Sequence, residues 1–124
     1  MIMSLEKAEE FLKAAQRCLE ERWYNAAVSR AYYAMFQAAQ TALASAGIDR
    51  SWWSHGGLQA TFSTELVRRR KLYPLSLVHN LIEAMELRHT ADYSDIQISP
   101  RRATRIVRAA AEFLHHVKEV IDNA

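Results

Sequence analysis

The stretch from Ala26 to Ala39, AAVSRAYYAMFQAA, decides the fold of this chain. Alanines recur within it and just beyond it at spacings of four, three, four and four residues, at positions 27, 31, 34, 38 and 42. At a helical period these alanines share one narrow side, which then carries almost no side-chain bulk. The pattern predicts a central helix that a neighbouring helix can approach closely.

Polar side chains interrupt the same stretch. Arg30, Tyr32 and Tyr33 lie beside the alanines in a helix expected to be largely buried. Buried hydroxyls and charges need partners. We therefore expect a polar feature inside the helical bundle or at its edge, and this is the first indication of function.

Length and composition favour one helical domain spanning residues 1–124. The sequence is half apolar and about a quarter charged, with only three glycines and two prolines for turns, and a chain of this length can bury a core without disulfides. The single cysteine, Cys18, cannot form an internal disulfide and is interpreted as a small core residue. Because no leader or long apolar run is present, we expect a soluble, cytoplasmic protein with no membrane partner.

Helix start and stop signals divide the chain into five helical segments. The predicted initiators are Ser4, Asn25 and Pro74, together with the Ser99-Pro100 pair, and Gly47 is the predicted terminator of the second helix. The resulting ranges are 5–21, 25–46, 58–67, about 74–93 and 100–121.

The segment between Ile48 and Gly57 is predicted to be a loop. In one interpretation, its two tryptophans cover an open end of the bundle and His55 caps the following helix. In the alternative, Gly56 and Gly57 allow a substrate to approach the backbone while His55 contacts it.

Arg88 continues an inward-facing apolar side of the fourth segment, because it lies three residues after Met85 and seven after Leu81. Asp92 follows one helical turn later. The simplest interpretation is an Arg88–Asp92 ion pair at a partly exposed helix end, stabilising the helix by about 0.3–0.5 kcal/mol. The alternative is a functional charge.

Two basic clusters stand out although the net charge is only +2. The first, Arg68 to Lys71, suits a helix C-terminus. The second, which begins at Arg101 and includes Arg102, Arg105 and Arg108, opposes the dipole of the last helix. Either acidic neighbours or an RNA phosphate can compensate for it.

No metal and no cofactor is predicted. His115 and His116 are adjacent, so their side chains point in different directions on a helix and do not form a zinc-binding pair. Glycine-rich phosphate loops and paired cysteines are also lacking.

Four pieces of the sequence, in order, resemble the HEPN domain family (higher eukaryotes and prokaryotes nucleotide-binding). They are AVSRAYYAMFQAAQTALASAG, WSHGG, LRHTADYSD and a final amphipathic helix, and together they cover essentially the whole chain. The resemblance implies an all-α, up-and-down bundle of four long helices plus a short helix, commonly a homodimer. It also implies a small nucleotidyltransferase as toxin–antitoxin partner, and active members of the family are metal-independent RNases.

The RNase motif of the family is an arginine, usually a polar residue next to it, and a histidine a few residues later. Arg88 and His89 match the first two positions, but Tyr93 stands where the last histidine is expected. A phenol, with an ordinary pKa near 10, is a poor general acid or base at neutral pH. His89 and His55 are the alternative proton-transfer groups.

Three hypotheses follow. The first is a module that binds a nucleotide, RNA or a nucleotidyltransferase through a polar pocket. Its candidate residues are Arg30, Tyr33, His55, Arg88, Asp92, Tyr93, Arg101 and Arg105. The second is an RNase toxin in which Arg88 stabilises the pentavalent phosphate, His89 or His55 transfers protons and Tyr93 orients the scissile group. The third is a dimeric structural protein.

Overall fold

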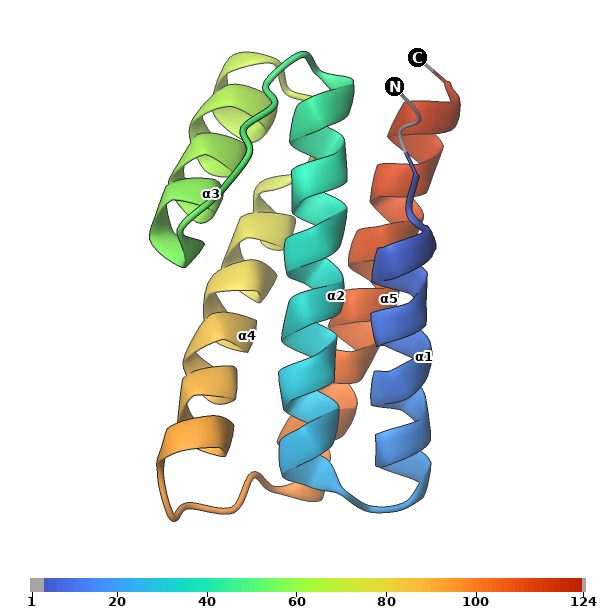
Figure 1. Ribbon diagram of the computed structural model, residues 1–124, viewed down its shortest axis with the longest axis vertical. Coiled ribbons are helices and arrows are strands. Elements are labelled where there is room, and N and C mark those ends of the chain that lie inside the picture. The colour runs from blue at the N-terminus through green and yellow to red at the C-terminus, as the bar shows by residue number, and fades with distance from the viewer. Residues whose placement is uncertain (1–3, 124) are drawn as a thin grey trace.

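The computed structural model describes residues 4–123, and the regular structure within them is entirely helical. The elements are α1 (Glu6–Glu20), α2 (Tyr24–Ser45), α3 (His55–Thr61), η1 (Phe62–Arg69), α4 (Leu75–Tyr93) and α5 (Pro100–Asp122). The long helices α1, α2, α4 and α5 alternate in direction, while α3 and η1 form a shorter rod beside them (Figure 1). The predicted all-α, up-and-down bundle is confirmed.

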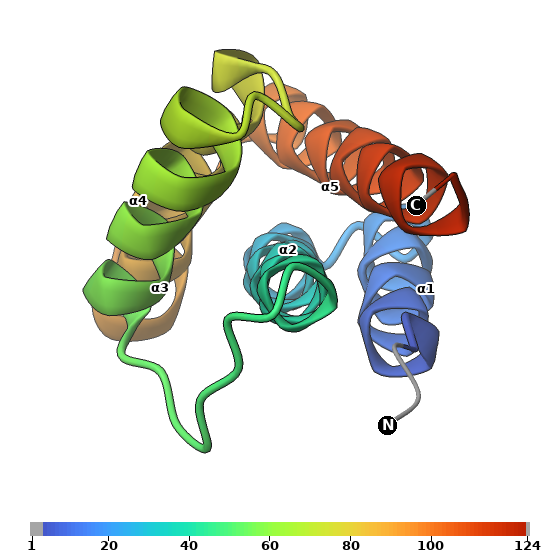
Figure 2. The ribbon, with the colours of Figure 1, turned by 90° about the horizontal axis from the view of Figure 1, so that it is seen from above.

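Helix α2 is the centre of the bundle. Seen along the bundle axis, it lies between α1, α5 and the α3–α4 pair (Figure 2), and it packs against each of them. The alanines at positions 27, 31, 34, 38 and 42 are at most 3% exposed, which confirms the predicted stripe of small residues. Because these side chains are short, the surrounding helices can lie close to the α2 backbone.

The helix-end signals were partly right. Ser99 Oγ accepts a hydrogen bond from the Arg102 N–H at 3.2 Å, with Pro100 opening α5, and Gly47 adopts the predicted left-handed conformation, with φ of 85°. The prediction for Asn25 was wrong, because Asn25 lies inside α2. Its side chain instead accepts from the Ile98 N–H at 3.0 Å and so fastens α2 to the segment before α5.

The start of α3 differs from the prediction. Ser54, not His55, caps this helix, since Ser54 Oγ accepts from the Gly57 N–H at 2.9 Å. Gly56 and Gly57 therefore belong to the first helical turn. A Cβ at Gly57 would lie 2.6 Å from Ser54 Oγ, so the close cap explains glycine at this position.

Two further boundaries were wrong. The predicted helix 58–67 is the last part of α3 followed by the π-helix η1, which reaches Arg69. A period of 3.6 residues does not distinguish these two helix types over so short a length. Pro74 has an extended conformation and precedes α4 rather than forming its first turn.

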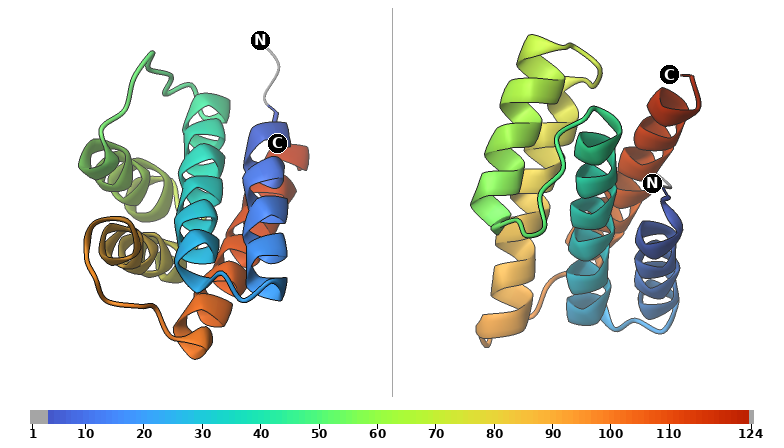
Figure 3. Two further views of the ribbon diagram at one scale, coloured as in Figure 1. Left: turned by 60° about the horizontal axis from the view of Figure 1, so that its bottom comes forward. Right: turned by 45° about the horizontal axis from the view of Figure 1, so that its top comes forward.

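The segment between α2 and α3 runs back along the outside of the bundle, so that α3 begins near the middle of α2 (Figure 3). Trp53 in this segment is buried, and the Arg50 guanidinium lies 4.3 Å from the centre of its ring. Trp52 is 75% exposed. Only one of the two tryptophans therefore covers the core as predicted.

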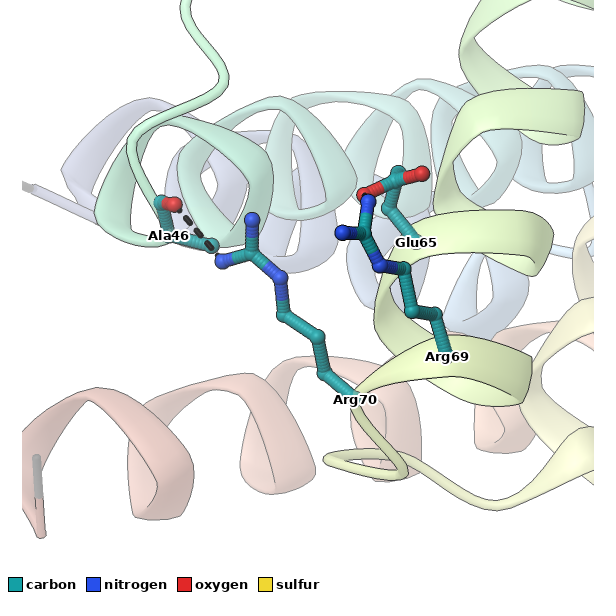
Figure 4. Close-up of polar contacts among 4 residues, drawn as sticks. All are labelled: Ala46, Glu65, Arg69 and Arg70. Carbon is teal, nitrogen blue, oxygen red and sulfur yellow. Dashed lines mark hydrogen bonds and ion pairs between the residues drawn. The ribbon is translucent and has the colours of Figure 1, made fainter.

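The first basic cluster makes contacts within the fold at the C-terminus of η1. Arg69 pairs with Glu65 at 3.2 Å, and Arg70 donates a hydrogen bond to the Ala46 carbonyl at 2.8 Å (Figure 4). The second contact joins the end of η1 to the end of α2. These contacts support the structural interpretation of the cluster at a helix C-terminus.

Candidate functional site

Arg88 lies in the interior of the bundle, on the side of α4 that faces α2. It is only 7% exposed, and its Nη1 atom is 3.9 Å from Asp92 Oδ2, so the predicted ion pair exists at a buried rather than an exposed arginine. The guanidinium carbon lies 5.2 to 5.9 Å from the ring centres of Tyr32, Tyr33 and Tyr93. Its Nε has no hydrogen-bond partner within residues 4–123. A buried charge with an unused donor is costly, which makes this position a candidate for a functional site.

His55 reaches the same cluster through Tyr32. The Tyr32 hydroxyl and His55 Nδ1 are 2.5 Å apart, joining α2 to the start of α3. Burial raises the pKa of Tyr32, so the hydroxyl keeps its proton and is the donor. Burial and, to a lesser extent, the charge of Arg88 lower the pKa of His55. At neutral pH His55 is therefore a neutral imidazole whose Nε2 carries the hydrogen.

An open hollow of about 540 Å³ lies next to Arg88, between α2 and the end of α4, with one contribution from α1. We call it the α2–α4 pocket, and it is lined by Phe11, Ser29, Arg30, Tyr33, Asp92 and Tyr93. Ser29 donates a hydrogen bond to Asp92 at 3.3 Å, which links its two main walls. Tyr93, the last residue of α4, is 71% exposed at its rim.

Helix periodicity explains this grouping. Ser29 and Tyr33 are one turn apart on α2, and Arg30 is three residues before Tyr33, so all three share a side that the alanines do not occupy. On α4, Asp92 lies one turn after Arg88. The pocket forms where these two polar sides face each other.

The structure brings most of the predicted site residues together. Arg30, Tyr33, Asp92 and Tyr93 line the pocket, with Arg88 behind them. The other predicted site residues lie outside its lining. They are His55, which contacts Tyr32; His89, whose exposed ring lies 5.1 Å from that of Tyr93; and Arg101 and Arg105, which line a separate hollow on α5.

Sequence reasoning missed Ser29 and Phe11 as pocket residues and did not pair Tyr32 with His55. The four-residue spacing of Ser29 from Tyr33 could have identified Ser29 as a pocket residue. Phe11 belongs to an apolar side of α1 that gives no sign of a pocket, and Tyr32 and His55 are 23 residues apart in the chain.

Within residues 4–123, no three His, Cys, Asp or Glu side chains lie close enough together to hold a metal ion. None of the helices in this range is long and apolar enough to cross a membrane.

Comparison with known proteins gives concordant matches over nearly the whole chain. The family model described as "HEPN domain" matches residues 2–120. The chain is 31% identical over 119 residues to the "UPF0332 protein glr0978" of Gloeobacter violaceus, covering 89% of this chain and 92% of that protein. It is also 30% identical over 118 residues to the "Putative toxin MJ0142" of Methanocaldococcus jannaschii, covering 94% of this chain and 78% of the relative. A second protein of that organism, "Putative toxin MJ0605", is 30% identical over 118 residues, with coverages of 94% and 85%.

Proposed function

This chain belongs to the HEPN domain family, and from that premise we propose that it is a toxin-type module that binds RNA or a ribonucleotide in the α2–α4 pocket. The observation that carries the proposal is the arrangement of Arg30, Tyr33, Asp92 and Tyr93 around one hollow, with buried Arg88 behind it. Two relatives that carry toxin in their names support the toxin-type part of the proposal.

The pocket offers a group for each part of a ribonucleotide. Arg30 is exposed and can bind a phosphate through charge-assisted hydrogen bonds. The exposed ring of Tyr93 can stack on a base. Asp92 can accept hydrogen bonds from ribose hydroxyls, including the 2′-hydroxyl that distinguishes RNA from DNA. A carboxylate would repel a free phosphate, so the pocket fits a nucleotide better than inorganic phosphate.

We favour binding over cleavage because of the chemistry at the end of α4. Tyr93 replaces the histidine that the family's RNase motif has at its last position. His89, which matches the middle position, is exposed, and its ring is tilted by 49° against that of Tyr93. The pocket lining itself contains no histidine.

A metal-independent RNase is the second candidate, and the neutral state of His55 favours it. Because its pKa is lowered, His55 is a neutral imidazole at neutral pH, and Nδ1 can accept a proton once the Tyr32 hydroxyl no longer donates to it. In this mechanism His55 or His89 takes the proton of the 2′-hydroxyl, whose oxygen attacks phosphorus. The bond between phosphorus and the 5′-oxygen breaks, and the imidazolium so formed gives the proton to that oxygen. Arg88 would stabilise the pentavalent phosphate and Tyr93 would orient it.

We propose that the protein is a homodimer, which light scattering of the purified protein tests. We also propose that a small nucleotidyltransferase binds it as antitoxin. Co-expression with a nucleotidyltransferase encoded beside it should yield a stable complex, and a neighbouring locus without such an enzyme would count against this pairing.

Binding of a fluorescent single-stranded oligoribonucleotide tests the proposed function. Arg30→Gln and Tyr93→Ala should each weaken binding about tenfold or more, because they remove a charged hydrogen bond and a stacking surface. Lys118→Gln, a matched change at an exposed position of α5, should have no effect. If all three variants bind like the wild type, the pocket is not the RNA site.

An RNA cleavage assay with EDTA present separates the two candidate functions. The binding proposal predicts intact RNA after prolonged incubation. Cleavage by the wild type that is lost in Arg88→Ala would establish the RNase and refute a purely binding role. Repeating that assay with His55→Gln and His89→Gln would then identify the proton-transfer group.

A further inference from the structure

The second basic cluster forms a continuous surface on α5. Arg101, Arg105 and Arg108 are spaced by four and three residues and therefore lie on one side of the helix, spread over about 10 Å along its axis. Together with Pro100 and Thr104 they line a hollow of about 510 Å³. We call these three arginines the α5 arginine face. Arg102 is exposed but does not line this hollow.

Acidic neighbours compensate only part of this charge. Arg105 forms an ion pair with Glu83 of α4. Arg101 and Arg108 form no ion pair with any residue between positions 4 and 123. The contrast with the first basic cluster is clear, since Arg69 and Arg70 there contact a carboxylate and a carbonyl of the fold. Ion pairs among the described residues therefore do not compensate the charges of Arg101 and Arg108.

The surroundings of the face suit a nucleic-acid backbone better than a protein. Protein interfaces usually have an apolar centre. Within residues 4–123, the large hydrophobic side chains that are exposed are Trp23, Trp52, Leu72, Leu75, Tyr93 and Ile96, and none of them is on α5. Arginines without an apolar centre are typical of contacts to phosphates, which fix the position of a strand without reading its sequence.

The face and the pocket are connected through α4. This helix supplies Asp92 and Tyr93 to the α2–α4 pocket and Glu83 to the ion pair with Arg105. It also ends at the same end of the bundle at which α5 begins (Figure 1). Glu83 and Asp92 are nine residues apart and lie on opposite sides of α4, so a strand held in the pocket reaches the α5 arginine face by passing round this end of the bundle.

We propose that the α5 arginine face binds the phosphate backbone of a single-stranded RNA whose nucleotide occupies the α2–α4 pocket. The proposal rests on the proposed function and extends it from one nucleotide to a strand. The pocket contacts one nucleotide with its own phosphate, whereas Arg101 and Arg108 contact phosphates outside it. A mononucleotide uses the pocket only, and a longer RNA uses both surfaces.

The salt dependence of binding tests whether the α5 arginine face contacts RNA phosphates that lie outside the pocket. The probes are a fluorescent single-stranded oligoribonucleotide of about 20 nucleotides and adenosine monophosphate. Each phosphate contact in a single strand contributes about −0.7 to the slope of log affinity against log salt concentration. Replacing Arg101 and Arg108 together by glutamine should make the RNA slope shallower by about 1.4 and leave the affinity for adenosine monophosphate unchanged. Arg102→Gln, on the same helix with the same charge change, should alter neither quantity.

Several results would overturn the proposal. An unchanged RNA slope in the double variant, or an equal reduction in Arg102→Gln, would mean that the face makes no specific phosphate contact. If poly-glutamate binding but not RNA binding required Arg101 and Arg108, the face would belong to an acidic protein partner. Melting temperatures of all variants verify that they are folded.

Failure of this inference can be told from failure of the proposed function. If Arg30→Gln weakens binding of both probes while the α5 double variant behaves like the wild type, only the inference fails. If the wild type binds neither probe at low salt, the proposed function and the inference both fail.

Discussion

The two sides of α2 differ in what they do. On one side the alanines at positions 27, 31, 34, 38 and 42 are buried and carry no polar atoms in their side chains. On another side Ser29, Arg30 and Tyr33 line a hollow, where Ser29 donates a hydrogen bond to Asp92 of α4 and the Tyr33 ring lies 5.7 Å from the Arg88 guanidinium. One helix thus supplies both the packing centre and a wall of the candidate site. Substitutions on the alanine side should therefore change the stability of the protein, and substitutions on the pocket side should change ligand binding, within the same few turns of α2.

The largest effect on stability is expected on the alanine side. Ala34 is fully buried, so Ala34→Leu overpacks the contact with the neighbouring helices and should lower the free energy of unfolding by about 1 to 3 kcal/mol. Ala26→Leu makes the same chemical change at an exposed position of α2 and should shift it by no more than about 0.5 kcal/mol. Urea denaturation measures both. Equal values would contradict the distinction between the two sides.

A smaller effect is expected where α2 contacts His55. Tyr32→Phe removes the hydroxyl that bonds to His55 Nδ1 and should destabilise the fold by about 0.5 to 1.5 kcal/mol. Tyr33→Phe is the matched control, because the Tyr33 hydroxyl makes no hydrogen bond to any residue from 4 to 123. In thermal unfolding, Tyr32→Phe should have a lower melting temperature than Tyr33→Phe. The reverse order would show that the Tyr32–His55 bond does not stabilise the protein.

The smallest expected effect depends on pH. His55 has a lowered pKa in the folded state, so between that value and the unfolded pKa near 6.5 the unfolded chain binds more protons. Stability should therefore fall as the pH drops through and below about 6.5. His55→Gln removes this contribution, so the stability difference between wild type and variant should shift in favour of the variant as the pH is lowered. A difference that is constant with pH would mean that His55 titrates as it does in the unfolded chain.

The alanine side and the pocket side were not equally predictable. The alanine stripe, the Ser99–Pro100 helix start and the inward position of Arg88 follow from local periodicity, and the structure has all three. Asn25 and His55 were misjudged because each side chain bonds to a distant segment rather than to its own helix end. Local sequence rules contain no information about such partners.

The candidate site was predictable only in outline. Arg30 and Tyr33 were expected to lie near the end of the helix containing Arg88 and Tyr93, and the structure places them there. The separation of Arg101 and Arg105 from this group depends on how α5 packs behind α2 (Figure 2). That packing is set by the whole bundle, so the sequence pattern of α5 alone did not reveal it.

Titration of the protein with adenosine monophosphate, followed by NMR of the tyrosine rings, tests the central claim most directly. Tyr33 and Tyr93 line the α2–α4 pocket, whereas Tyr73 is buried in a different hollow, beside Ala42 and Val120. We predict saturable shifts of the Tyr33 and Tyr93 signals, no shift of Tyr73, and loss of the response in Arg30→Gln. Unchanged Tyr33 and Tyr93 signals at millimolar nucleotide would contradict a ribonucleotide site in this pocket.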